Sequence, residues 1–420
     1  MHKLPAELLI HIFCSLVQKF RSWRQYPDLC YHRFILCAVC SRWRSIALST
    51  HALWASMSIE DIPHDPDLYS KPLSALKLHL ERSGPTTPLA IRFIRCPQSF
   101  LTQAWEILDP YFCHISSITI MPMHYEFPLM LPISQARGLK RLTYHAYASS
   151  NESSAPQFDF FVARESAPSL YYLDLRNVAW QTLGRIPLAQ LRFLRLARPS
   201  TLPDEWGQVF EILRQCTSLV TLHAHLRGPP LIDAPPALID LPHLERLTTC
   251  HADLPSRLRV PKLEFLHAMS RGAICNPNQP LLHLKALVID QSDGDYGVRQ
   301  WRLPESFTAV QQLHFRECGR LSVQYILSEL IQPTTSGESY ISMFTQLRTL
   351  GFSHKMVLGQ SDMGLTPIVL DFLDSNPNIR IECIQEELFI DGLTLQQHEN
   401  SSTAANVCGM HQLTWLPSAT

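Results

Sequence analysis

Glycine and charged residues are both scarce in this chain of 420 residues. There are 15 glycines, about half of the ~7% share usual in globular proteins, against 31 prolines. No G-x-G-x-x-G or G-x-x-x-x-G-K-S/T segment occurs, which argues against an enzyme with a glycine-rich phosphate loop. Charged residues make up 17% of the chain, below the ~25% that is usual, and 46% of residues are apolar. The composition therefore predicts extensive burial and excludes disorder over the whole chain.

Long hydrophobic runs and an excess of positive charge are also missing. No run of 18 or more uncharged apolar residues occurs, so we expect no membrane span. A net charge of −1 gives no reason to expect nucleic-acid binding. The apolar stretch 8–17 could be read as a signal peptide, but Pro5 and Glu7 interrupt its start and no small-residue cleavage site follows it. We expect a cytoplasmic and/or nuclear protein with neither a membrane nor a nucleic acid as partner.

The cysteines and the catalytic motifs give little sign of site chemistry. Twelve cysteines are scattered along the chain, and the closest pair, Cys37 and Cys40, has C-x-x-C spacing without a second such pair. We expect packing cysteines in a reducing compartment rather than a metal site. No G-x-S-x-G, H-E-x-x-H or H-R-D segment is present. We therefore expect a chain that is not an enzyme and that needs no cofactor.

The first sixty residues are rich in large apolar side chains at helical spacing. A first helix is predicted from Pro5 onwards, with one apolar face formed by Leu8, Leu9, Ile12, Phe13 and Leu16. A second helical segment is predicted over about 34–48, followed by a break near Thr50. A hairpin packed against the rest of the chain would explain this periodicity. However, a unit of about 55 residues has little volume to bury so many large side chains, which indicates a surface for a partner.

A longer motif runs through the same region. Its segments are Leu4-Pro5-Ala6-Glu7-Leu8-Leu9, Ile12-Phe13, Leu16, Val39-Cys40-Ser41-Arg42-Trp43-Arg44-Ser45-Ile46-Ala47 and Leu53-Trp54. Together, over roughly residues 3–60, they resemble an F-box. The resemblance implies a three-helix unit that binds a Skp-type adaptor and, through it, a cullin ubiquitin ligase. The adaptor-binding positions that it implies are Leu4, Pro5, Leu9, Ile12, Leu16, Val39, Cys40 and Trp43.

Two features depart from the F-box pattern. The stretch Gln18–Tyr31 is longer than the usual turn between the two halves of the motif, which raises the question of whether it alters adaptor binding. His51-Ala52 also stands where a proline often precedes the Leu-Trp pair.

Beyond residue 110 one short pattern recurs, in which three apolar positions are separated by two variable residues and then by one. The ten copies begin at Ile115, Leu139, Leu170, Leu191, Leu219, Leu244, Leu263, Leu284, Val310 and Leu347. Successive copies start 19 to 37 residues apart, close to the 20–29 residue period of leucine-rich repeats. The chain thus resembles a degenerate form of that repeat, in which each short strand buries its apolar face by stacking on its neighbours. A globular α/β domain whose strands share the pattern by chance is the alternative.

These patterns predict an α/β fold: an N-terminal three-helix F-box followed by an irregular leucine-rich-repeat solenoid with parallel strands. The F-box would cover residues 1–60, and residues 61–110 would form a linker and N-terminal cap, with helices in 73–80 and 100–108 and a strand in 89–93. Residues 111–395 would form the substrate-binding repeat domain, and residues 396–420 a flexible tail.

The variable residues of each repeat strand would alternate onto the inner, concave face of the array. This places Arg141 and Asp174 on that face, together with the positions expected to bind a target protein. The expected target-binding residues are Tyr172, Arg176, Arg195, His223, His225, Arg246, His267, His314 and Arg316. Arginine and histidine dominate, which favours an acidic or phosphorylated segment of the target. The alternative is a solvated strand face whose histidines make local hydrogen bonds.

Together, the two resemblances imply the substrate-recognition subunit of a Skp–cullin–F-box E3 ubiquitin ligase, which recruits a target of unknown identity for ubiquitination. Other subunits would transfer the ubiquitin, so this chain would need no nucleophile. The alternative is a leucine-rich-repeat interaction scaffold that binds the Skp-type adaptor without ubiquitin transfer.

Overall fold

The structure is a computed structural model that describes most of the chain in segments. These are residues 4–21, 29–122, 136–146, 167–178, 180, 183, 186–198, 201, 205–226, 238–251, 254–269, 281–290, 309–316, 330, 340–353, 376 and 378–384. The chain divides into two compact units, residues 1–219 and 220–420, which we call unit 1 and unit 2. The predicted tail, 396–420, lies outside the described residues.

The α-helices whose bounds the structure gives belong to unit 1. They are α1 (Ala6–Arg21), α2 (Leu29–Val39), α3 (Ser41–Ser49), α4 (His51–Trp54), α5 (Ser70–Ser83), α6 (Gln98–Leu108) and α7 (Trp206–Gln215). The segment predicted as one helix over about 34–48 is two helices, so that prediction was wrong. Cys40 has extended backbone angles, and its Sγ accepts a hydrogen bond from the backbone N–H of Trp43 at 3.4 Å. Cys40 therefore begins α3 as its N-cap, a role that side-chain acceptors perform in many helices. The predicted break at Thr50 separates α3 from α4.

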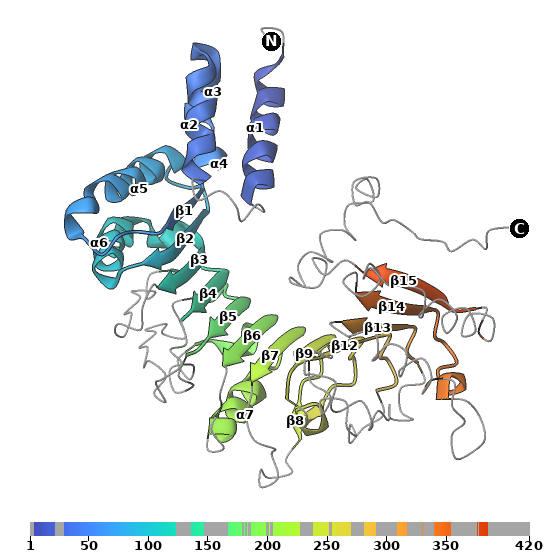
Figure 1. The fold of residues 1–420 in the computed structure, drawn as a ribbon. Coiled ribbons are helices and arrows are strands. Elements are labelled where there is room, and N and C mark those ends of the chain that lie inside the picture. Colours follow the sequence, from blue (N-terminus) through green and yellow to red (C-terminus); the bar gives the residue numbers. More distant parts are fainter. Residues whose placement is uncertain are drawn as a thin grey trace, which may run out of the picture. The chain divides into compact units, whose positions relative to one another are not determined.

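The strands of unit 1 form a parallel sheet in sequence order (Figure 1). They are β1 (Ser56–Glu60), β2 (Leu89–Cys96), β3 (Ile115–Pro122), β4 (Arg141–His145), β5 (Tyr172–Arg176) and β6 (Phe193–Arg198). Strand β1 was not predicted, and it pairs with β2 along its whole length. The region expected to be an F-box up to residue 60 therefore ends inside the sheet. The region expected to be a linker and cap contains α5, β2 and α6.

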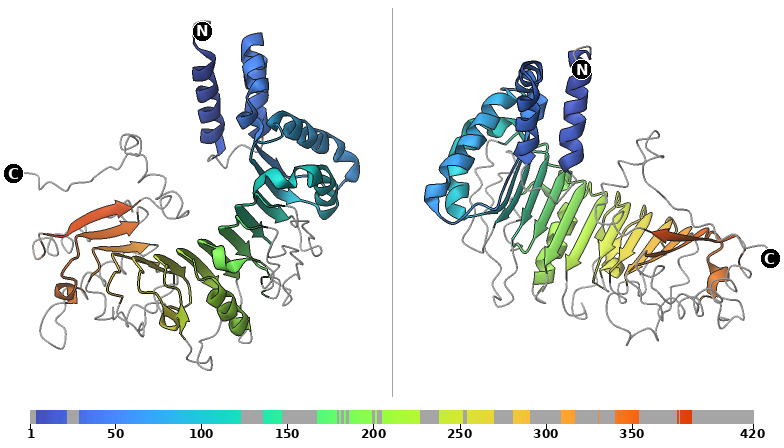
Figure 2. Two further views of the ribbon diagram at one scale, coloured as in Figure 1. Left: turned by 180° about the vertical axis from the view of Figure 1, so that it is seen from behind. Right: turned by 45° about the horizontal axis from the view of Figure 1, so that its top comes forward.

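Unit 2 contains a second run of parallel strands, seen side by side in both views of Figure 2. They are β7 (Thr221–Leu226), β9 (Arg246–Thr249), β11 (Phe265–Ala268), β12 (Ala286–Asp290), β13 (Gln312–Arg316), β14 (Thr349–Ser353) and β15 (Arg380–Ile384). A separate parallel pair joins β8 (Ile239–Asp240) to β10 (Leu258–Arg259). Short 3-10 helices span Pro66–Leu68, Asp109–His114, Leu188–Gln190, Pro255–Arg257 and Tyr340–Met343. All ten copies of the apolar pattern coincide with strands of the two units.

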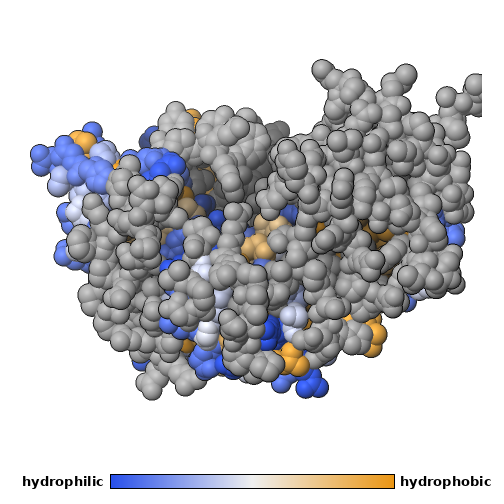
Figure 3. Space-filling view, turned by 60° about the horizontal axis from the view of Figure 1, so that its bottom comes forward, coloured by the Kyte–Doolittle hydropathy of each residue, from blue (hydrophilic) through white to orange (hydrophobic). Residues whose placement is uncertain are grey.

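The alternation of apolar and variable residues explains the sheets. Ile118, Leu142, Leu173 and Leu194 lie opposite one another on successive strands, and each is fully buried. Burying a leucine or isoleucine side chain stabilises the fold by about 1.5–3 kcal/mol, so a register shift that exposed this row would be costly. On β2, Phe93 packs on the same side against α6, where its ring contacts Trp105 at 5.5 Å between centroids. On the face drawn in Figure 3, the described residues are mostly hydrophilic, and hydrophobic ones form only small, separate patches.

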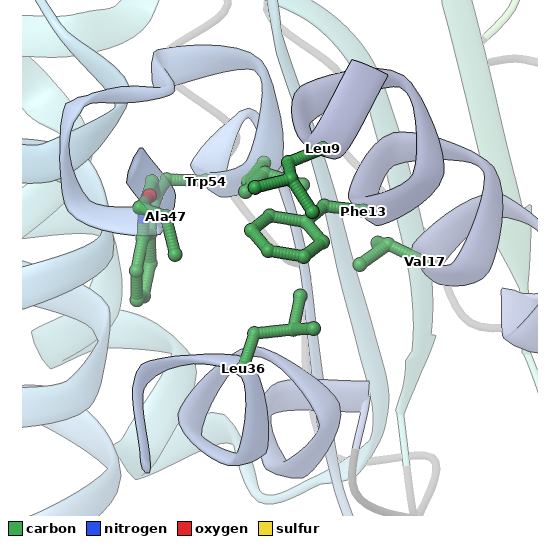
Figure 4. Packing of buried hydrophobic residues seen from close by; sticks show 7 residues of the cluster. Leu9, Phe13, Val17, Leu36, Ala47 and Trp54 are labelled. Carbon is green, nitrogen blue, oxygen red and sulfur yellow. The ribbon is translucent and has the colours of Figure 1, made fainter. Parts of the chain in front are cut away.

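Helices α1–α4, which we call the helical head, share one small core. Leu9, Phe13 and Val17 lie at i, i+4 and i+8 on α1 and point towards Leu36 of α2 (Figure 4). The core residues are Leu9, Phe13, Val17, Leu36, Ala47, Leu53 and Trp54. Phe13 is fully buried, and its ring centroid is 4.9 Å from that of Trp43. This packing arranges the helices around a single apolar centre.

Trp54 and its neighbours join the helical head to the sheet of unit 1. The indole Nε1 of Trp54 donates to the carbonyl of Ala47 at 2.8 Å, and its ring lies 5.0 Å from that of His79 on α5. Arg33 of α2 is buried; it donates to the carbonyl of Ser56 at the start of β1, and its Nη1 lies 3.4 Å from Nε2 of His79. The guanidinium of Arg82 lies 4.5 Å above the indole. Residues of α2, α4, α5 and β1 thus meet in one buried junction.

Acid should weaken this junction through His79. Burial, followed by the positive charges of Arg33 and Arg82, lowers the pKa of His79 from 6.5 to about 3. Between pH 6.5 and 3 the unfolded chain binds a proton at this ring that the folded chain does not. The free energy of unfolding should therefore fall as the pH decreases below 6.5, by up to about 1.4 kcal/mol per pH unit. Amide hydrogen exchange of α5 against pH would measure this, with His79→Gln as the control. Equal slopes in the two proteins would contradict the prediction.

Candidate functional site

The helical head leaves a row of large apolar side chains in solvent. Leu8, Ile12 and Leu16 lie at i, i+4 and i+8 on α1, beside the row that forms the core, and Leu8 and Ile12 are 49% and 43% exposed. On α2, Phe34, Ile35 and Val39 are also exposed, Val39 by 50%. Several large apolar side chains left exposed on one small helical unit are typical of a surface that binds another protein. We call these six residues the apolar surface of the head.

The structure places most of the predicted adaptor-binding residues at the surface. Besides Cys40, five of them are exposed: Leu4, Pro5, Ile12, Leu16 and Val39. Cys40 is also exposed, although its sulfur caps α3, and Trp43 is half-buried against Phe13. Leu9 differs from the rest, because it is only 2% exposed and packs inside the head. It belongs to the core and offers almost no surface to a partner.

Three exposed apolar residues of the head were not among the residues predicted to bind the adaptor. Leu8 lies four residues before Ile12, so helical spacing alone could have included it. Phe34 and Ile35 could not be found in this way, because the sequence around them did not show where α2 begins. The helix begins at Leu29, five residues before the predicted segment.

The unusually long stretch between the two halves of the motif is partly helical. Helix α1 continues to Arg21 and α2 begins at Leu29, so both helices extend into the stretch Gln18–Tyr31. The residues between these helices, 22–28, lie outside the described part of the chain. Two lengthened helices therefore take up much of the extra sequence.

The second candidate surface is the face of the unit 1 sheet opposite the buried leucines, which we call the polar face. Side chains in register across β2–β6 form two rows on it. One row is Ala90, Ser117, Arg141, Tyr172 and Phe193, and the next is Arg92, Thr119, Thr143, Asp174 and Arg195. Because side chains alternate between the two faces of a strand, residues of one strand that share this face are two positions apart in the sequence.

Asp174 is the buried centre of one part of this face. Its carboxylate is 4% exposed and lies 3.1 Å from Nε2 of His145 and 3.6 Å from Nε of Arg176. Burial raises the pKa of Asp174, but the His145 hydrogen bond and the charges of His145, Arg195 and Arg176 outweigh it and lower the pKa overall. The aspartate is therefore ionised and already balances positive charge on this face. Arg176 and Arg195, predicted to bind an acidic target, face this internal anion.

Beside this cluster the polar face carries aromatic rings. Tyr172 and Phe193 stack across β5 and β6 with ring centroids 4.2 Å apart and planes 8° from parallel. The guanidinium of Arg141 lies 5.7 Å from the ring of Tyr172, and its Nε donates to the hydroxyl of Tyr171 at 3.1 Å. Such cross-strand pairs stabilise a sheet by about 0.2–1 kcal/mol each. Tyr172 thus lies between an arginine and a second ring.

Unit 2 contains a similar buried carboxylate. Asp290 is 5% exposed, and its Oδ1 lies 3.0 Å from Nε2 of His267 and 3.8 Å from Nε of Arg316. His267 and His314 were predicted to bind a target, and both are buried, so in this structure they offer a target little surface. Burial lowers the pKa of His314 to about 4, so this ring is neutral at pH 7. The side chain of Arg316 is 12% exposed and faces the same internal anion.

The remaining predicted target-binding residues of unit 2 are half-buried. The rings of His223 and His225 are parallel, with centroids 6.2 Å apart, and Arg246 begins the neighbouring strand. Within the described residues, no group of three or more His, Cys, Asp and Glu side chains could hold a metal ion. No helix in the described part of the chain has the length and apolar character needed to cross a membrane.

Comparison with known proteins leaves the family open. No family model matches the chain, and the search of curated proteins gave no significant match.

Proposed function

We propose that this chain is the substrate-recognition subunit of a Skp–cullin–F-box E3 ubiquitin ligase. In this proposal the helical head is an F-box that binds a Skp-type adaptor and, through it, a cullin. The parallel strands are turns of a degenerate leucine-rich-repeat solenoid whose polar face binds the target protein. The chain itself is not catalytic; it raises the effective concentration of the target near the ubiquitin donor.

The exposed apolar row on α1 is the single observation that carries the proposal. Ile12 and Leu16 stay exposed although Phe13, one residue away from Ile12, is fully buried. The head therefore has enough apolar side chains to fill its own core and still presents others to solvent. A surface of this kind suits a permanent partner subunit, and the motif in this region is the one that resembles an F-box.

Co-purification tests the proposal. The full-length chain should bring down a Skp-type adaptor and a cullin together. A Leu4→Ala/Pro5→Ala variant should capture less of both, because these exposed residues begin the motif. Capture of the adaptor without a cullin would favour a scaffold that uses the adaptor outside ubiquitin transfer. Absence of the adaptor from the wild-type sample would contradict both functions.

A further inference from the structure

Two cysteines lie three positions apart in the sequence, where α2 ends and α3 begins. Cys37 belongs to the last turn of α2 and packs, half-buried, against the core of the head. Cys40 separates the two helices and is exposed. The sequence predicted two packing cysteines, but only Cys37 packs in this way, and both are free thiols in this structure. The pair therefore combines one thiol that solvent can reach with one that is held inside the head.

The backbone brings the two residues within reach of a disulfide. Helix α2 continues to Val39, so helix geometry sets the Cα atom of Cys40 about 5 Å from that of Cys37. Disulfides join residues whose Cα atoms are roughly 4.4–6.8 Å apart. Nε of Arg44 donates to the carbonyl of Cys37 at 2.8 Å, which ties the end of α2 to α3. The backbone thus allows an S–S bond once the side chain of Cys40 rotates.

The surroundings of the two sulfurs differ in a way that suits stepwise oxidation. Sγ of Cys40 accepts the backbone N–H of Trp43 at the N-terminus of α3, a position that favours negative charge on sulfur. Burial raises the pKa of Cys37, although the charges of Arg82 and Arg44 oppose that shift, so this thiol is protonated at pH 7. Cys40 is therefore the sulfur that an oxidant meets first, and Cys37 is placed to react with the product.

We infer that Cys37 and Cys40 form a redox pair that hydrogen peroxide converts to a disulfide, and that this disulfide weakens adaptor binding. The sulfur of Cys40 attacks one peroxide oxygen and becomes a sulfenic acid, and one water molecule leaves. The sulfur of Cys37 then attacks the sulfur of Cys40, forms the S–S bond and releases a second water. The two thiols lose two hydrogen atoms in all, and one peroxide is reduced to two waters. A dithiol reductant reverses the reaction.

The effect on the adaptor rests on the proposed function, in which the head is the adaptor-binding unit. Val39, Cys40 and Trp43 were all predicted to bind the adaptor. A disulfide would take the sulfur of Cys40 away from the N–H of Trp43, so α3 would lose its N-cap. Trp43 also packs on Phe13 of α1, so a change at the start of α3 reaches the helix that carries the exposed apolar row. Because the adaptor would cover Cys40, the oxidation acts on the free chain.

Peptide mapping of the folded full-length chain after mild peroxide treatment tests the pair. Tryptic cleavage after Arg33 and Arg42 yields peptide 34–42, which contains Cys37 and Cys40 and no other cysteine. Free thiols are alkylated before digestion. In the treated chain this peptide should then carry no alkyl group and be lighter than the dithiol by two hydrogen atoms, and dithiothreitol should reverse the change.

Other cysteines of the chain serve as comparisons in the same sample. Cys96 and Cys216 should remain reduced, because burial raises the pKa of each thiol to about 12. Cys14 packs against the same core as Cys37, so it is the competing partner. A peptide 34–42 that stays reduced, or one linked to Cys14, would overturn the pairing.

Adaptor capture by the same preparations, after the peroxide is removed, tests the regulation. Peroxide should reduce capture by the wild type by about tenfold or more, the effect of losing one central contact of an interface. Dithiothreitol should restore it. Cys37→Ala should capture the adaptor as the reduced wild type does and keep most of that capture after peroxide, since no disulfide can form. Cys113→Ser, which removes an exposed thiol outside the head, should respond to peroxide as the wild type does.

The remaining outcomes separate failure of the inference from failure of the proposed function. A disulfide without loss of capture, or an equal loss in Cys37→Ala, would overturn the regulation. If the reduced wild type captures the adaptor and peptide 34–42 stays reduced after peroxide, the inference fails and the proposed function stands. If the reduced wild type captures no adaptor, the proposed function and the regulation both fail, whereas the mass of the peptide still decides whether the two cysteines form a redox pair.

Discussion

Replacing Ile12 and Val39 by aspartate should reduce adaptor capture by about 100-fold or more, because central apolar residues of an interface often contribute about 2 kcal/mol or more each. Both side chains are large, exposed and on different helices of the head. An aspartate at either position would bring an unpaired charge into the interface. Titration of a labelled Skp-type adaptor with the full-length chain would measure the loss.

The fold should survive this change, since neither side chain belongs to the core of the head. The thermal midpoint of the Ile12→Asp/Val39→Asp variant should therefore match that of the wild type. A Leu68→Asp/Leu282→Asp variant is the matched control, because both leucines are exposed and lie outside the head. Adaptor binding that is lost equally in both variants would point to general damage and would contradict a specific role for the apolar surface of the head.

Replacing Trp54 by alanine should destabilise the helical head by about 4 kcal/mol, as expected for removing a large aromatic side chain from a core. The indole is 1% exposed, bonds to the Ala47 carbonyl and contacts His79 and Arg82. Its loss would leave a cavity at the junction of α2, α4, α5 and β1.

Amide hydrogen exchange would measure this effect locally, because a chain with two units need not unfold in one step. Exchange in α1–α4 should become about 1000-fold faster in Trp54→Ala, the ratio that corresponds to about 4 kcal/mol. The strands of unit 2 should keep their wild-type rates. Leu8→Ala, on the exposed row of α1, is the control and should change exchange little. Similar rates in Trp54→Ala and Leu8→Ala would show that the junction does not hold the head together.

Helix α1 shows what a local sequence pattern can predict and what it cannot. Helical spacing places Leu8, Leu9, Ile12 and Phe13 on one broad apolar face, and this was predicted correctly. It could not say that Leu9 and Phe13 would be enclosed while Leu8 and Ile12 would remain in solvent. That division depends on where α2 and α3 pack, and therefore on contacts between residues far apart in the sequence.

The positions of the strands that carry the recurring apolar pattern were determined by the sequence alone, because an apolar residue at every second position can be buried only on one face of a strand. The partners of the polar residues were decided by the tertiary structure. Asp174 meets His145 from the preceding strand, and Asp290 meets Arg316 from the following one. The irregular spacing of these strands along the sequence hides such pairs, since only the parallel register of the folded strands brings the two residues together. Arginines that looked equivalent in the sequence therefore differ: Arg176 faces a buried carboxylate, and Arg141 does not.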